Sequence, residues 1–217
     1  NVDAGFSIVG YTASTGNSTV GHGLSQAPEL LIIKARETAN TSWAVGSDEM
    51  TSWVYSMELD TTDAEASVAS RFNSTAPTSS VFSIGTSGYT NINTEDLIAY
   101  CFHSVDGYSK VGSYTGNGNA DGPFVYTGFR PMFVLTKSTE RSEHWRIRDT
   151  VRDTNNPLNI HLEASTSGAD QTSASVDIDI LSNGFKLRSS DSGVNHSGEK
   201  WIFMAFAETP FKYSNAR

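Results

Sequence analysis

Short stretches in which apolar and polar residues alternate recur along the chain, and they predict β-strands. A period of two places one set of side chains in a core and the other in water, and it occurs in residues 53–59, 158–162 and 176–180. Short continuous apolar runs are typical of strands covered on both faces, and they occur in residues 30–33, 132–135 and 202–206. Clusters of Gly, Ser, Asn and Asp separate these stretches and predict turns.

Helical periodicity is nearly absent. Residues 63–70 alone have a sequence that suits one or two helical turns. Ser and Thr together supply 52 residues, and only 18% of the residues are charged. Such a polar but weakly charged composition is typical of secreted or virion β-structure rather than of helical proteins. The sequence therefore predicts an all-β protein.

The chain contains an internal repeat. Aromatic residues, prolines and core aliphatic residues recur in the same order after 102 to 104 residues. The matched pairs are Tyr11 and Tyr114, Pro28 and Pro131, Lys34 and Lys137, Trp43 and Trp145, Leu59 and Leu162, Phe82 and Phe185, Asn93 and Asn195, Phe102 and Phe206, and Tyr108 and Phe211. Chance matches would not keep this order, so we predict that a unit of about 100 residues was duplicated. The equivalent tryptophans are expected to have a core role in both copies.

The repeat predicts two domains, residues 1–107 and 108–217, with the boundary within residues 107–112. We expect a β-sandwich with jelly-roll-like topology, since each copy supplies about six strands. Each copy either closes into a small sandwich of its own or packs its sheet face to face with the other. Residues 108–114 are strand-like and contain no flexible linker, so we expect the copies to be closely packed.

Charge and composition limit the partners. The chain carries 24 acidic and 15 basic side chains, a formal charge of −9. Nucleic-acid binding requires a basic surface, so we expect no nucleic-acid partner. There is no run of 18 apolar residues and no signal-peptide pattern, so we expect no membrane insertion. The abrupt start at Asn1 suggests a domain taken from, or ending, a longer chain.

A search for catalytic signatures finds none. The serine-hydrolase elbow, the phosphate-binding loop and the dinucleotide fingerprint are all missing. The five histidines are scattered, and His144 and His161 are interpreted as solvent-facing strand residues. Asp177 and Asp179 have a spacing that fits a pair of glycosidase carboxylates, but their alternation with apolar residues indicates the polar face of a sheet. The single cysteine, Cys101, is interpreted as a buried, inert thiol. We therefore predict no enzyme activity and no cofactor.

The segment 117–122 partly resembles a calcium-binding loop. Asn117, Asn119 and Asp121 place side-chain oxygens at alternate positions before a glycine. The twelfth position of an EF-hand would be Gly128, where a bidentate Glu is required, so no EF-hand is predicted. Consecutive tight turns are the simpler interpretation, with a looser cation site as the alternative.

Aromatic residues near loops are candidates for ligand contact. Aromatic rings offer a large contact area at low entropic cost, and they stack on the apolar faces of sugars. Tyr89, Tyr114 and Tyr126 lie within or beside Gly- and Asn-rich loops. Together with Asn117, Asn119 and Asp121 they form the predicted ligand-binding set, with structural packing of the tyrosines as the alternative.

Two segments carry a resemblance to a known family. Residues 112–131, GSYTGNGNADGPFVYTGFRP, and residues 205–217, AFAETPFKYSNAR, resemble a domain family of tail fibres and other large structural proteins of tailed phages, especially marine ones. The similarity covers most of the chain, although residues 11–17 of the first copy lack the Asp-Gly-Pro continuation. The resemblance supplies no catalytic or binding residues. It implies a virion protein with repeated β-sandwich units that assembles into a homotrimer. It also implies contacts with other virion proteins and adhesion to a bacterial surface glycan or protein receptor.

Three functions are consistent with the sequence. The first is a tail-fibre module that binds a host-surface receptor, with a glycan as the favoured ligand. The second is a purely structural fibre or capsid-decoration subunit. The third is a tailspike-like glycan hydrolase that uses Asp177 and Asp179.

Overall fold

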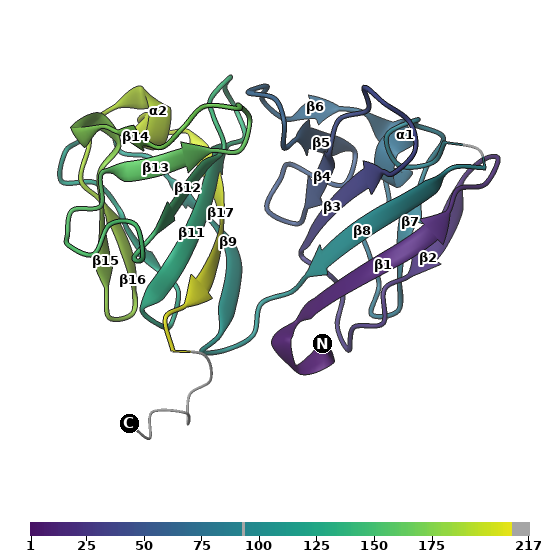
Figure 1. The fold of residues 1–217 in the computed structure, drawn as a ribbon, viewed down its shortest axis with the longest axis horizontal. Helices are drawn as coiled ribbons and strands as arrows, with labels where there is room; N and C mark the ends of the chain where they lie inside the picture. The colour runs from purple at the N-terminus through teal and green to yellow at the C-terminus, as the bar shows by residue number, and fades with distance from the viewer. Residues whose placement is uncertain (93, 210–217) are drawn as a thin grey trace. The chain divides into compact units, whose positions relative to one another are not determined.

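The computed structural model describes residues 1–92 and 94–209. The chain divides into two compact units, Asn1–Ser104 and Val105–Arg217, whereas the repeat placed the boundary after residue 107. The described residues are nearly all β-structure, with seventeen strands and four helices of a single turn (Figure 1). The predicted all-β class is confirmed.

The strands of the first unit are β1 (Phe6–Thr12), β2 (Ser18–Gly21), β3 (Leu30–Ala35), β4 (Ala44–Ser47), β5 (Tyr55–Glu58), β6 (Ala66–Ser67), β7 (Val81–Ile84) and β8 (Asp96–Phe102). Six of them form an antiparallel sheet in the order β1-β8-β3-β4-β5-β6, and β2 pairs with β7. Figure 1 shows β8 between β1 and β3. Helix η1 (Val2–Ala4) precedes the first strand, and α1 (Ala69–Phe72) supplies a single turn. The sequence predicted helical turns in residues 63–70, but α1 overlaps this range only at its end, and residues 66–67 form strand β6.

The strands of the second unit are β9 (Ser109–Thr115), β10 (Phe124–Tyr126), β11 (Pro131–Ser138), β12 (Arg146–Asp149), β13 (Ile160–Glu163), β14 (Gln171–Thr172), β15 (Ile178–Leu181), β16 (Gly184–Leu187) and β17 (Lys200–Ala207). The large sheet has the order β14-β13-β12-β11-β17-β9, and a smaller sheet has the order β10-β16-β15. The short helices are η2 (Ala174–Val176) and α2 (Ser192–Asn195). Residues 176–180, expected as one strand, are thus divided between η2 and β15.

The large sheets of the two units have the same strand order when β9 is matched with β1, β17 with β8, and β11 to β14 with β3 to β6. Their registers agree as well, because Tyr11 lies opposite Leu97 and Tyr114 lies opposite Trp201. The same backbone bonds recur, such as Ala13 N to Glu95 O and Gly116 N to Glu199 O, both 2.9 Å. This agreement supports the predicted duplication, which stays a prediction.

The register also corrects one residue match. Leu162 lies opposite Ile147, and the residue at this place in the first unit, opposite Val45, is Met57. Leu59 is therefore not the counterpart of Leu162. The matches that involve Asn93 and Phe211 lie outside the described residues.

Each unit has a hydrophobic core of its own. In the first unit, alternate residues of β3 and β8 meet Phe82 and Ile84 of β7. In the second unit, Trp201 and Phe203 of β17 meet Phe185 of β16 and both isoleucines of β15. Alternation along the strands therefore turns one face of each large sheet toward its smaller sheet.

The equivalent tryptophans differ in burial. Trp145 is buried, whereas Trp43 is half-buried and lies 6.2 Å from the ring of Tyr100. A core role therefore holds for Trp145 alone. Cys101 is a buried, unpaired thiol, and burial raises its pKa to about 12, which agrees with the prediction that it is inert.

Candidate functional site

The loop between β9 and β10 is held by its own side chains. Asn117 Oδ1 accepts a hydrogen bond from Asn119 N (3.0 Å), and Asn119 Oδ1 accepts one from Asp121 N (2.9 Å). The Asn117 side-chain nitrogen donates to Asp121 O (3.1 Å). Such bonds from Asn side chains to the backbone two residues on build consecutive tight turns, as predicted. In the described part of the chain, no group of three or more His, Cys, Asp or Glu residues is placed to hold a metal ion.

A buried asparagine anchors this loop to the rest of the unit. Asn195 is fully buried, and its Oδ1 accepts a hydrogen bond from Asn117 N (2.8 Å). Its side-chain nitrogen donates to Asn119 O (2.8 Å), Ser189 O (2.7 Å) and Asn117 Oδ1 (3.0 Å). Asn91 has the same place in the first unit, where it bonds to Ser14 N, Gly16 O and Gly85 O. Asn91 is therefore the counterpart of Asn195, which corrects the match with Asn93. The predicted ligand residues Asn117 and Asn119 thus shape the loop that carries Asp121.

Tyr114 is a core residue and is not available to a ligand. Its ring is 8% exposed and lies 6.1 Å from both Trp201, in a stacked arrangement, and Phe185, in an edge-on arrangement. Its hydroxyl donates to Val194 O (2.9 Å). Burial raises the pKa of this hydroxyl far above its usual value. The alternative of structural packing holds for Tyr114.

Tyr89 belongs to the first unit, whereas the loop belongs to the second. It is half-buried, and the guanidinium of Arg71 lies 4.7 Å from the centre of its ring. Arg71 in turn bonds to Ser56 and Glu58 beneath it. This cation–π contact gives Tyr89 a structural partner.

Strand β10 presents two aromatic rings to solvent. Phe124 is 46% exposed and Tyr126 is 65% exposed, and the residue between them, Val125, lies in the core. Among the large apolar side chains that are exposed in the described residues, these two are the aromatic ones. They point to the same face because the side chains of a strand alternate. Phe124 was missed in the sequence, although its alternation with Val125 and Tyr126 was a signal that could have identified it.

A glycine leaves room for these rings. Gly184 of β16 lies opposite Tyr126, and a Cβ at this position would come within 3.0 Å of the Phe124 ring and 2.1 Å of the Val125 carbonyl oxygen. The Phe124 ring therefore packs on the backbone of Gly184, which has no side chain. We call the surface formed by Phe124, Tyr126 and Gly184 the aromatic platform.

Charged side chains lie beside the aromatic platform on the same face. Lys186 is the cross-strand neighbour of Phe124, and its Nζ lies 3.0 Å from the carboxylate of Asp121 and 2.6 Å from Gly122 O. Arg188 lies 3.3 Å from Asp179 and 3.9 Å from Asp121. The hydrogen bond and charge of Lys186 hold the pKa of Asp121 below its usual value. Two carboxylates and two cations thus alternate beside the rings.

The carboxylates of Asp177 and Asp179 have different surroundings. Asp179 pairs with Arg188, whereas Asp177 is buried, and burial raises its pKa. A retaining or inverting glycosidase needs two carboxyl groups on either side of one bound sugar bond. The two carboxylates differ in burial and in pairing, and the glycosidase hypothesis stays a prediction.

The interior of the second unit holds a polar cluster that the sequence did not predict. His161 is buried rather than solvent-facing, and its Nε2 lies 3.8 Å from Glu163. Arg146 and Arg148, also buried, lie on the neighbouring strand β12. Burial and these two positive charges lower the pKa of His161 to about 4. His144, the other predicted surface histidine, is half-exposed and pairs with Glu163 at 3.4 Å.

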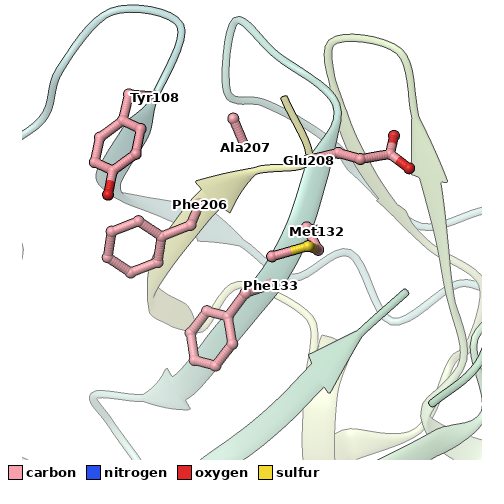
Figure 2. A pocket seen from close by; sticks show the side chains of 6 residues that line it. All are labelled: Tyr108, Met132, Phe133, Phe206, Ala207 and Glu208. Carbon is pink, nitrogen blue, oxygen red and sulfur yellow. The ribbon is translucent and has the colours of Figure 1, made fainter. Parts of the chain in front are cut away.

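An apolar groove of about 460 Å³ lies elsewhere on the second unit. It is lined by Tyr108, Met132, Phe133, Phe206, Ala207 and Glu208. Figure 2 shows the rings of Tyr108, Phe206 and Phe133 on the same side, with the Glu208 carboxylate directed away from them. The Phe206 ring lies 5.9 Å from each of the other two rings. The groove is almost wholly hydrophobic and holds no pair of reactive side chains.

Comparisons with known proteins give a family and no function. The model of a family described as Domain of unknown function (DUF7483) matches residues 1–210. No curated protein and no solved structure matches the chain. No helix among the described residues has the length and apolar character needed to cross a membrane.

Proposed function

Starting from the premise that the chain belongs to the DUF7483 family, we propose that it is a non-enzymatic adhesion module of a phage tail fibre that binds a glycan on the host surface. The observation that carries this proposal is the aromatic platform on β10 and β16. Exposed apolar side chains that gather in one patch, unlike single ones, mark sites of interaction. A platform of two rings with ion-paired polar groups beside it suits the apolar face and the hydroxyl groups of a sugar.

The virion location is supported by the resemblance of residues 112–131 to tail-fibre domains. In this proposal the module works as part of a homotrimer within a fibre. Several weak sites then act together, so that modest affinity at each site is enough for adhesion. The bound receptor is a bacterial surface polysaccharide or lipopolysaccharide, and the fibre contacts other virion proteins along its length.

A binding experiment on host surface material tests the adhesion proposal. The purified chain is passed over immobilised host lipopolysaccharide and capsule, alone and as an assembled trimer. Reproducible, saturable binding that is lost in Tyr126→Ala is the expected result. Absence of binding by the trimer would refute adhesion.

A structural role is the second candidate, and the apolar groove favours it. A groove lined by three aromatic rings is the kind of surface that a neighbouring protein chain covers in an assembly. Native mass spectrometry distinguishes the two roles. A purely structural subunit assembles through the groove and binds no glycan, and Phe133→Ser would then weaken assembly while Tyr126→Ala would not.

A further inference from the structure

The charges beside the aromatic platform carry information about the class of glycan. Resting on the proposed function, we infer that the platform binds a neutral, hydroxyl-rich oligosaccharide rather than an acidic one, and that the chain has one such site. The argument rests on the local charge balance, the total charge and the difference between the two units.

The polar groups beside the platform sum to zero charge and are already paired. Asp121 and Asp179 supply two negative charges, and Lys186 and Arg188 supply two positive charges. A bound carboxylate or sulfate would gain from the two cations but would face two carboxylates within the same network. A hydroxyl group both donates and accepts hydrogen bonds. It can therefore bond to adjacent carboxylate and ammonium groups without changing the net charge of the network.

Exposure makes these groups accessible to a sugar. The side chain of Asp121 is 81% exposed and that of Arg188 is 44% exposed. The Asp121 carboxylate keeps a fixed position because the hydrogen-bonded loop and Lys186 hold it. A positioned carboxylate needs little reordering when it accepts hydrogen bonds from two sugar hydroxyls.

The total charge disfavours an acidic ligand as well. The chain carries −9, and a net charge of the same sign slows and weakens the approach of a polyanion, most strongly at low salt. A neutral oligosaccharide is not subject to this repulsion. Its affinity is therefore expected to be independent of salt.

The β2–β7 ladder, where the equivalent residues of the first unit lie, offers no second platform. This ladder has the register of β10–β16, with Val20 opposite Phe82 in the place of Val125 opposite Phe185. The residues that correspond to Phe124, Tyr126 and Lys186 are Thr19, Gly21 and Ser83. A stoichiometry of one oligosaccharide per chain follows.

The test uses the whole chain and an array that carries neutral oligosaccharides, such as gluco-, galacto- and mannohexaoses, beside acidic ones, such as hyaluronan and oligogalacturonate. Positive ligands are then titrated by calorimetry at low and high salt. We expect binding to neutral glycans with a stoichiometry of one and the same affinity at both salt concentrations.

Variants locate the site. Phe124→Ala and Tyr126→Ala are each expected to lower the affinity about tenfold, because each removes a stacking surface. Tyr126→Ala is the cleaner variant since Phe124 also covers Gly184, and thermal unfolding checks that both variants are folded. Val151→Ala, which removes another exposed apolar side chain of the second unit, is the matched control and should bind normally.

Asp121→Asn distinguishes the two ligand classes. It removes a negative charge from the network and is expected to weaken neutral-glycan binding. Preference for acidic glycans that rises in Asp121→Asn and falls with salt would overturn the neutral class while leaving glycan adhesion intact. Binding to none of the glycans would instead overturn the proposed function, and normal binding by both aromatic variants would overturn the location of the site.

Discussion

Replacing Asn195 with alanine removes four hydrogen bonds from the interior of the second unit. These bonds join the buried amide to Asn117, Asn119 and Ser189 at 2.7 to 3.0 Å. At a net contribution of about 1 kcal/mol each, they stabilise the unit by roughly 4 kcal/mol. Asn117 and Asn119 are exposed, so water can form hydrogen bonds with their freed groups and offset part of the lost stabilisation. We therefore expect the free energy of unfolding to fall by about 3 kcal/mol.

Asn91→Ala makes the same change in the first unit. Its amide forms three bonds of 2.6 to 2.8 Å to Ser14, Gly16 and Gly85. The expected loss is about 2 to 3 kcal/mol, slightly smaller because one bond fewer is lost. Similar losses at both positions would follow from the matching hydrogen bonds of the two units.

Urea denaturation followed by tryptophan fluorescence measures these changes. Each unit has its own core and its own tryptophans, so each variant should lower the midpoint of one transition at unchanged slope. Asn155→Ala is the control, because Asn155 is exposed and bonds only to Thr154 in the described structure. A loss below 1 kcal/mol for Asn195→Ala, or an equal loss for the control, would refute the role of the buried amide.

Three further predictions concern the second unit. Gly116→Ala should destabilise it by more than about 2 kcal/mol in the same urea assay, since the added Cβ would lie 2.2 Å from the His196 carbonyl oxygen. Tyr114→Phe should cost about 1 kcal/mol through the lost bond to Val194 O and leave glycan affinity unchanged, as calorimetry would show. His161 should titrate near pH 4 by NMR, because burial and two neighbouring arginines lower its pKa. Since the unfolded chain then binds a proton that the folded chain does not, stability should fall as the pH drops from about 6.5 to about 4, and His161→Gln should remove that part of the decline.

The sequence predicted what depends on local pattern. Alternation and turn residues gave the all-β class and the tight turns of residues 117–121, because both follow from backbone preferences within a few residues. The interpretation of Cys101 also held, since the thiol lies inside a continuous apolar run. In each case the deciding neighbours are adjacent in the chain.

The failures concern which face of a strand turns inward. In β13 the sequence placed Ile160 and Leu162 in the core and His161 in water, whereas His161 and Glu163 are the buried residues. The reason is long-range, because β12 turns its two arginines inward and the polar face of β13 packs with them. Tyr114 was misplaced in the same way, since its partners Trp201 and Phe185 lie more than 70 residues further along the chain.

The two units share the contacts that determine their fold but differ in the residues of the aromatic platform. Their ladders, their buried asparagines and the tyrosine bonds of Tyr11 to Thr90 O and Tyr114 to Val194 O are equivalent. Changes at such positions leave buried polar groups without partners and cost stability in either unit. Phe124 and Tyr126 lie on the edge strand β10, and the residues at the equivalent places of the first unit are Thr19 and Gly21. The proposed binding role would account for the presence of these rings in the second unit, and the loss of glycan affinity in Tyr126→Ala is the measurement that separates it from packing of Phe124 on Gly184.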